Sequence, residues 1–426
     1  MTPDSIFVDA EWIEVADAIG ARLCRDALWC EDGCFWLGSI PVPGGHRRLA
    51  SLGSTLYSGT AGIGLFLAAL ADATSDPTYA RYADGALRFA HRDPSREAVG
   101  PGFYQGATGL AYAFIVGGRL LGADLWTDRG LQALRALPPK PGPGTRADVM
   151  EGSAGAILAL HYAYEACGLA CADLVDSYAR ALIEEGRTSA EGVSWSPGRQ
   201  GMMHLLGYSH GTAGIADALN RAATMLNDRS IAAAAAAAMR YENAFFDPAR
   251  NNWPDFRLAS RPEDGEFMTA WCHGAPGIAV SRMLLTPPSP DLAPALLTTL
   301  QSLSRLENQQ DFCLCHGVCG NADVLLSAWR MSGEKPLLDA VLSVAAYGRE
   351  VFHRAESDWP LGGSIEYRQL MTGVAGIGYF YLRLASRGRL ESVLFPSISP
   401  DLPLAPESAR SQDVASGRLP DPVSKA

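Results

Sequence analysis

Seven stretches of the chain are almost continuously apolar, and each follows a pair of glycines three residues apart. Examples are IGLFLAAL after Gly62, LAYAFIV after Gly109 and AILALHYAY after Gly155. Ala, Leu and Ile fall on most faces of a 3.6-residue period, as they do in a helix that is buried on all sides. The pattern therefore predicts seven buried helices, each beginning at a glycine pair.

The glycine pairs form an internal repeat. A single Gly-x-x-Gly is a weak signal, because Gly accounts for 44 of the 426 residues. Seven copies in order, their first glycines 43 to 63 residues apart, indicate a repeat architecture. The copies are SGTAG from Ser58, QGATG from Gln105, EGSAG from Glu151, HGTAG from His210, HGAPG from His273, HGVCG from His316 and TGVAG from Thr372.

More polar, amphipathic helical stretches lie between the copies, at Pro77–His91, Ala172–Glu185, Ser230–Phe246 and Lys335–Phe352. They suit helices that cover the buried ones. We therefore expect an all-α fold, an α/α toroid of seven inner and seven outer helices. The first and last copies carry the same motif as the middle ones, which favours a closed ring over a solenoid with polar capping repeats.

This pattern covers most of the chain. We expect one toroid domain over residues 1–404, and a polar tail over 405–426 without apolar periodicity, which we expect to be disordered.

The glycines have a physical role at the turn into each buried helix. Without a Cβ, glycine permits positive φ and close approach of another backbone segment. The seven loops then converge at one end of the ring, where helix N-termini present free N–H groups. Residues just before each pair should line one pocket. A phosphate-binding loop is excluded, because no copy continues as Gly-Lys-Ser/Thr.

Chemically useful side chains occupy these pocket positions in three copies. They are Cys272–His273, Cys315–His316 and His210, whereas the first copy has only Tyr57–Ser58, which suggests no chemistry. Two Cys-His pairs on neighbouring copies of one loop suit a zinc ion, and a catalytic zinc keeps three protein ligands and an open fourth position.

We expect one zinc per chain, held by Cys272, Cys315 and His316, with His273 or His210 competing for a place. The alternative interpretation is that these cysteines are packed in the core, as cysteines commonly are.

Charge and apolar-run length narrow the possible partners. The chain has 35 Lys and Arg against 46 Asp and Glu, a formal charge of −11, which argues against a nucleic-acid surface. The longest apolar run, Ile231–Met239, is far shorter than the ~20 residues of a membrane span. The acidic N-terminus has no signal-peptide pattern, so we expect a cytoplasmic protein whose nine cysteines stay reduced.

The motifs resemble those of the lanthionine synthetase C-like (LanC-like) cyclases. The matching segments are WCHGAPGI from Trp271, LCHGVCGN from Leu314, YSHGTAGI from Tyr208 and DVMEGSAG from Asp148. WCHG followed by APG is most similar to the cyclase domains of bifunctional, class II synthetases. The resemblance implies a toroid with one zinc ion, bound by the residues that match Cys272, Cys315 and His316.

The resemblance also implies the reaction. A cysteine thiolate of a dehydrated precursor peptide adds to a dehydroalanine or dehydrobutyrine of the same peptide and forms a (methyl)lanthionine ring. Zinc makes the thiol nucleophilic, since a free thiol is mostly protonated at neutral pH. His210 matches the family's pocket histidine and is expected to protonate the enolate, and Asp148 is expected to orient His210. A separate dehydratase is a further expected partner.

One position departs from the family pattern. Simpler members carry an arginine four residues before the first zinc cysteine, where this chain has Met268, and often a tyrosine after that cysteine, where it has His273. The family arginine therefore has no counterpart at that position. We expect His273 to take a polar or acid–base role, and Arg257 and Arg261 lie just upstream.

Two other functions remain open at this point. A LanC-like transferase would add glutathione or another thiol to dehydroamino acids, and the product mass distinguishes it, because cyclisation leaves the mass unchanged. A non-catalytic peptide-binding scaffold with structural zinc would have a closed fourth ligand position, filled by His273. A toroidal glycosidase is disfavoured, because Asp148 and Glu151 are the only carboxylates near the loop ends and both belong to one repeat.

Overall fold

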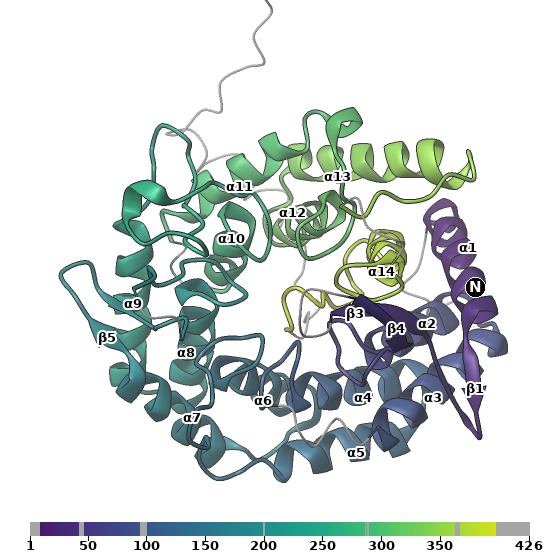
Figure 1. Cartoon of the computed structure of the whole chain (residues 1–426), viewed down its shortest axis with the longest axis horizontal. Coiled ribbons are helices and arrows are strands. Elements are labelled where there is room, and N and C mark those ends of the chain that lie inside the picture. Colours follow the sequence, from purple (N-terminus) through teal and green to yellow (C-terminus); the bar gives the residue numbers. More distant parts are fainter. Residues whose placement is uncertain are drawn as a thin grey trace, which may run out of the picture.

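The computed structural model describes residues 9–41, 47–93, 100–198, 201–285, 287, 289–362 and 367–397. In these ranges fourteen α-helices form two concentric rings, as the hydrophobic pattern predicts (Figure 1). The inner helices are α2 (Thr60–Thr74), α4 (Ala107–Leu121), α6 (Ser153–Cys167), α8 (Thr212–Leu226), α10 (Ala275–Met283), α12 (Val318–Ser332) and α14 (Val374–Ala385). The outer helices are α1 (Ala10–Asp26), α3 (Pro77–Arg92), α5 (Asp124–Arg135), α7 (Ala172–Glu185), α9 (Arg229–Asn243), α11 (Leu292–Ser302) and α13 (Lys335–Gly348).

The expected α/α toroid is thus confirmed, and its closure has a simple topology. Each of the first six inner helices packs against the outer helix that follows it in the chain. The seventh, α14, is covered instead by α1, which the sequence pattern did not predict, and α14 also packs against α2. The two ends of the repeat therefore meet and close the ring.

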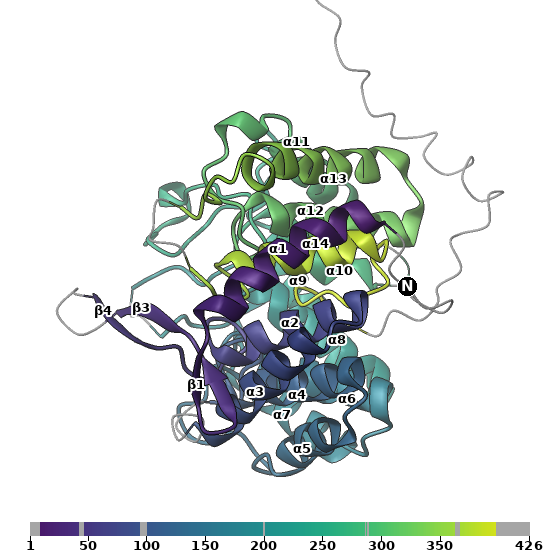
Figure 2. The same ribbon diagram turned by 90° about the vertical axis from the view of Figure 1, so that its right-hand side faces the viewer.

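Short elements decorate the rings. Three antiparallel hairpins, β1–β2 (Leu28–Cys30, Gly33–Phe35), β3–β4 (Leu37–Pro41, Arg47–Ser51) and β5–β6 (Arg187–Thr188, Val193–Ser194), were not predicted. The β3–β4 hairpin projects beyond the helices (Figure 2). Two 3₁₀ turns occupy Pro262–Asp264 and Leu306–Asn308, and a π-helical turn, Arg349–His353, follows α13.

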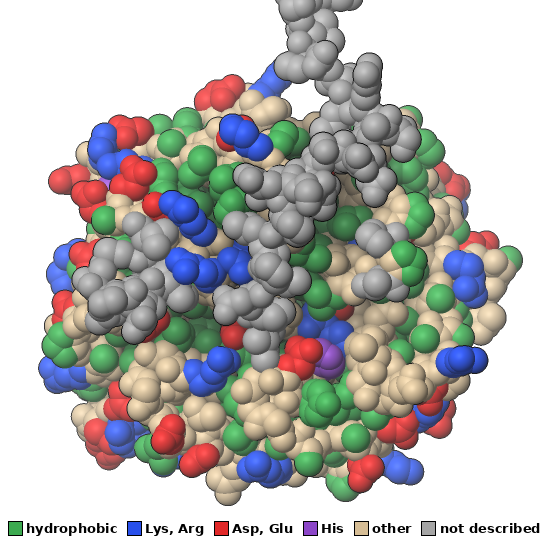
Figure 3. All heavy atoms as spheres, turned by 180° about the vertical axis from the view of Figure 1, so that it is seen from behind, with side chains coloured by type: hydrophobic (Ala, Val, Ile, Leu, Met, Phe, Trp, Pro, Cys, Tyr) green, Lys and Arg blue, Asp and Glu red, His purple; other side chains and the backbone are tan. Residues whose placement is uncertain are grey.

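The structure also bears on the expectations about membrane spans and surface charge. Within the described ranges, no helix has the length and apolarity that a membrane span requires. On the face opposite to that of Figure 1, acidic and basic side chains are interspersed (Figure 3). The expected domain end at residue 404 and the tail over 405–426 lie outside the described residues.

The two glycines of each repeat have different functions. The first is the N-cap of its inner helix, and among these seven residues only Gly274 uses positive φ, at 98°. The second allows a close backbone approach. A Cβ on Gly109 would lie 1.5 Å from the carbonyl oxygen of Phe103, six residues earlier, and the same carbonyl position crowds the second glycine in every repeat.

Backbone hydrogen bonds join the seven loops into a closed circle. We call the residues two positions before each first glycine the mouth ring: Tyr57, Tyr104, Met150, Ser209, Cys272, Cys315 and Met371. The bonds run from Tyr57 N to Tyr104 O, Gln105 N to Met150 O, Met150 N to Ser209 O, Ser209 N to Cys272 O, Cys272 N to Cys315 O, Cys315 N to Met371 O and Met371 N to Tyr57 O. All seven are 2.9–3.3 Å long, so the repeat fixes each mouth-ring residue relative to its neighbours.

The last described segment, Leu390–Pro396, crosses the middle of the ring (Figure 1). Side chains from the inner ring and its loops hold its backbone carbonyls: Tyr104 on Val393, Trp271 on Leu394, Tyr379 on Glu391, Arg383 on Leu390 and Arg221 on Pro396. Leu390, Val393 and Leu394 are buried. The segment therefore fills the inside of the toroid.

We predict that Gly109→Ala lowers the free energy of unfolding by about 3 kcal/mol, because the added methyl group overlaps the Phe103 carbonyl. Urea denaturation measures this change. Gly142→Ala is the matched control, since its Cβ would meet only the Thr145 hydroxyl at 4.0 Å. Equal stability of the two variants would show that the close approach does not constrain the loop.

Candidate functional site

Three of the expected ligands meet at the mouth ring. One ligand atom each from Cys272, Cys315 and His316 lies within 4.8 Å of the others. The hydrogen bond from Cys272 N to Cys315 O places the two cysteines on adjacent loops of the ring. Both cysteines are buried, and two thiols with one imidazole are a donor set that zinc binds. His273 does not join this group among the described residues.

Asp311 orients His316. Its Oδ2 lies 3.2 Å from His316 Nε2, which leaves Nδ1 for a metal, and its Oδ1 accepts from Cys313 N at 2.7 Å. A carboxylate behind a ligating histidine is the common arrangement in zinc proteins. Asp311, Cys313 and His316 also form a second group of potential ligand atoms that shares the imidazole with the first.

The electrostatics of the centre favour a cation. Hydrogen bonds with Asp311, then Cys272 and Cys313, together raise the pKa of His316 to about 12. Hydrogen bonding from Cys315 and then from His316 holds the pKa of the Cys272 thiol well below its ordinary value. The hydrogen bond with Cys272, and then burial, raise the pKa of the Cys315 thiol well above its ordinary value, so a divalent ion that binds here displaces protons from the cluster. The residues present therefore fit zinc.

Tyr57, which the sequence pattern treats as unremarkable, also reaches the cluster. Its hydroxyl donates a hydrogen bond to Cys315 Sγ at 3.0 Å across 258 residues of sequence. Burial, followed by the charge of Cys315, raises the pKa of Tyr57, so the phenol keeps its proton.

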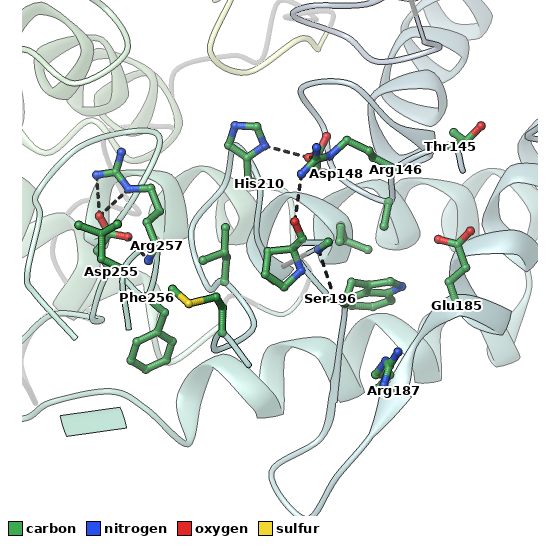
Figure 4. A pocket seen from close by; sticks show the side chains of 18 of the residues that line it. Thr145, Arg146, Asp148, Glu185, Arg187, Ser196, His210, Asp255, Phe256 and Arg257 are labelled. Carbon is green, nitrogen blue, oxygen red and sulfur yellow. Dashed lines mark hydrogen bonds and ion pairs between the residues drawn. The ribbon is translucent and has the colours of Figure 1, made fainter. Parts of the chain in front are cut away.

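His210 and Asp148 form a hydrogen-bonded pair on neighbouring repeats (Figure 4). His210 Nδ1 lies 2.8 Å from Asp148 Oδ2, and Asp148 Oδ1 accepts from Glu151 N at 2.8 Å. Asp148 is buried, whereas the His210 side chain is 34% exposed. Arg146 Nε lies 3.3 Å from Asp148 Oδ2. The carboxylate therefore holds the imidazole with Nε2 available to a ligand.

A second charged pair comes from the long loop before α10. Arg257 donates to Asp255 Oδ2 from Nε at 2.8 Å and from Nη2 at 2.6 Å, and Nη2 also lies 3.4 Å from Met268 Sδ. An arginine thus does lie against the residue that replaces the family arginine. The hydrogen bond with Asp255 is the main cause of the raised pKa of Arg257, and the charges of Cys272 and Cys315 contribute.

His273 lies behind this pair. It is 3% exposed, its Nδ1 is 3.5 Å from Asp255 Oδ1, and burial lowers its pKa. Arg261 pairs with Asp264 and Glu263 instead. The structure therefore places His273 against Asp255 in the protein interior.

The two charged pairs face one cavity of about 1150 Å³ (Figure 4). Its wall includes Arg146, Asp148, His210, Asp255 and Arg257, and apolar surface comes from Trp195, Met202, Leu205 and Phe256. Its lining does not include His273 or the expected ligands Cys272, Cys315 and His316. The cavity is slightly larger than the usual range of small-molecule sites.

Comparing the repeats as far as six positions before each first glycine would have identified two residues that the sequence analysis missed. Asp311 and Arg146 both stand six positions before the first glycine of their repeats, as Met268 does in its own. The residue pattern used only the one or two residues before each glycine, and the resemblance added Asp148, four positions before Gly152. Tyr57 gave no such signal, because only the closed ring brings it to Cys315.

Comparison with known proteins identifies a family that the chain matches. Residues 50–398 match the family model described as lanthionine synthetase C-like protein. The lacticin 481/lactococcin biosynthesis protein LcnDR2 of Lactococcus lactis subsp. lactis is 27% identical over 214 residues, which are 46% of this chain and 22% of that protein. The chain thus aligns with less than a quarter of that relative's length. The solved structure of nisin cyclase is similar in fold, with a TM-score of 0.59 and 17% identity over 79% of this chain and 92% of that one.

We predict that Asp311→Asn weakens zinc binding about 10- to 100-fold, because the amide cannot supply the charge that orients His316. Competition with a chromogenic chelator measures the affinity. Asp339→Asn, which removes an exposed partner of Lys335 on α13, should leave the affinity unchanged. Unaltered affinity in Asp311→Asn would mean that His316 does not depend on this carboxylate.

Proposed function

Because the chain belongs to the lanthionine synthetase C-like family, we propose that it is a zinc-dependent peptide cyclase. It joins cysteine thiols to dehydroalanine or dehydrobutyrine residues of a ribosomal peptide and forms lanthionine or methyllanthionine rings. The observation that carries this proposal is the cluster of Cys272, Cys315 and His316, whose Cys272 is hydrogen-bonded through its backbone to Ser209, the residue before His210.

Cys272, Cys315 and His316 hold the zinc ion in this proposal, and the ion lowers the pKa of the substrate thiol. The two cysteines come from adjacent mouth-ring positions, and Asp311 fixes the ring plane of His316. His273 does not belong to the ligand group, so it does not close the fourth position as a purely structural site requires. This observation disfavours the scaffold in which His273 is the fourth ligand.

His210 supplies the proton that completes the reaction. A C–S bond forms at the β-carbon as the C=C π bond breaks, and the electron pair moves onto the α-carbon and its carbonyl as an enolate. The proton that the thiol gave up is restored at the α-carbon, so the mass does not change. Asp148 binds His210 Nδ1, which leaves Nε2 as the donor on the cavity side.

Arg257 stabilises the enolate oxygen in this proposal. Its guanidinium is held in the cavity wall by two hydrogen bonds to Asp255. His273 lies against the other oxygen of Asp255, so we assign it the role of positioning this carboxylate. The guanidinium of Arg257 thus comes from the long loop before α10, since the position four residues before Cys272 is occupied by Met268.

The substrate in this proposal is a dehydrated, cysteine-containing precursor peptide, supplied by a separate dehydratase. All nine cysteines are free, which suits the reducing cytoplasm. We propose that residues 1–404 form a single toroid domain. Addition of a small external thiol by the same groups is the alternative reaction, and it differs in the mass of the product.

The decisive experiment incubates the zinc-loaded protein with a dehydrated peptide that contains one cysteine and one dehydroalanine. We expect a product of unchanged mass that no longer reacts with N-ethylmaleimide. Elemental analysis should find one zinc per chain, and Cys272→Ala should lose both the metal and the activity. A product heavier by one glutathione, when glutathione is present, would favour the transferase, and no reaction by a zinc-containing protein would favour the scaffold.

We predict that His210→Asn keeps the zinc and lowers the cyclisation rate by about 10²- to 10⁴-fold, the usual contribution of a general acid. Rates come from the loss of alkylatable thiol in a time course. His353→Asn, in the π-helical turn after α13, is the control, and this variant should cyclise the peptide at the wild-type rate. If His210→Asn is equally fast, another group protonates the enolate.

A further inference from the structure

Tyr57 occupies, in the first repeat, the position that Cys272 and Cys315 occupy in the fifth and sixth. All three stand two residues before the first glycine and belong to the mouth ring. Met371 lies between Tyr57 and Cys315 in that ring, hydrogen-bonded to both through its backbone. The ring therefore brings the phenol of the first repeat to the thiol of the sixth.

Two backbone hydrogen bonds and one ring contact hold Tyr57 in place. Tyr57 N donates to Tyr104 O at 2.9 Å, and Tyr57 O accepts from Met371 N at 3.1 Å. The two tyrosine rings pack edge to face with centroids 6.4 Å apart, and the Tyr104 hydroxyl is itself bound to Val393 O. Tyr57 thus presents its hydroxyl to Cys315 Sγ at 3.0 Å from a fixed frame.

The direction of this hydrogen bond follows from the chemistry of the two groups. A cysteine that ligates a metal is a thiolate and has no proton to donate, whereas a phenol has one. A hydrogen bond to a thiolate withdraws electron density from the sulfur. Such bonds tune the properties of copper–thiolate and iron–sulfur centres.

We propose that Tyr57 is a positioning residue of the metal centre, whose hydroxyl donates to the Cys315 thiolate and makes the bound ion a stronger Lewis acid. The inference rests on the proposed zinc function. Two thiolate ligands reduce the acidity of a zinc ion, and the Tyr57 hydrogen bond offsets part of that reduction. The substrate thiol is then deprotonated at lower pH than an unassisted centre allows.

The test replaces zinc by cobalt(II), whose sulfur-to-metal charge-transfer absorption reports the electron density on the thiolates. We expect Tyr57→Phe to move this absorption to lower energy, because a thiolate without a donor gives up an electron more easily. Tyr57→Met should do the same, and methionine is already present at two mouth-ring positions, Met150 and Met371. Tyr79→Phe is the control. It removes a hydroxyl on the outer helix α3 that is bonded to Asp17 of α1, and it should leave the absorption at the wild-type energy.

A second readout is the pH dependence of cyclisation by the zinc-loaded protein. In Tyr57→Phe the rising limb, which reports loss of the substrate thiol proton, should move up by at most about one pH unit, because only part of the effect of a hydrogen bond to Cys315 reaches the substrate thiol. If Tyr57 served only to stabilise the fold, Tyr57→Phe would lower the midpoint temperature of unfolding and leave this limb of the pH profile unchanged.

The outcomes separate this inference from the proposed function. If the wild-type protein takes up no cobalt and no zinc, the metal site and the role of Tyr57 are both wrong. If it takes up cobalt, and both Tyr57 variants keep the wild-type absorption and pH profile, only the role of Tyr57 is wrong. If Tyr57→Phe does not fold, the absorption of Tyr57→Met decides.

Discussion

The circle of backbone hydrogen bonds at the mouth is the constraint on which the site depends. Each bond contributes about 1 kcal/mol of net stability, a modest amount, but the circle fixes which side chains become neighbours. Cys272 and Cys315 are adjacent because their backbones are bonded, not because their side chains attract each other. The second glycine of each repeat permits this geometry, since any Cβ there would strike the carbonyl six residues earlier.

Charge is distributed unevenly around this circle. Anionic donors gather at the metal cluster, where Asp311 and the cysteines surround His316, whereas Arg146 and Arg257 lie in the cavity wall. Each arginine is tied to a buried carboxylate, Asp148 or Asp255, which itself touches a histidine. The cavity therefore holds two similar carboxylate-centred units, and only the first exposes its histidine to the cavity.

The sequence predicts the fold better than it predicts the surroundings of the metal. Periodicity identifies Pro77–Arg92 and Ala172–Glu185 almost to the residue, because amphipathic spacing is a local property. The repeat register also brings Cys272, Cys315 and His316 together. It does not reveal that α1 covers α14, that Leu390–Pro396 fills the ring, or that Tyr57 meets Cys315. Those contacts join residues hundreds of positions apart, and no spacing along the chain encodes them.

The way the ring closes also limits when the protein becomes functional during its synthesis. Helix α1 leaves the ribosome first, yet its partner α14 and the segment Leu390–Pro396 are made after every other described element. Contacts of such long sequence separation form slowly. Until they form, the apolar faces of α1 and the inner helices stay open to water, and exposed apolar surface of this kind favours aggregation. The bond from Met371 to Tyr57 closes the mouth circle at the same late stage.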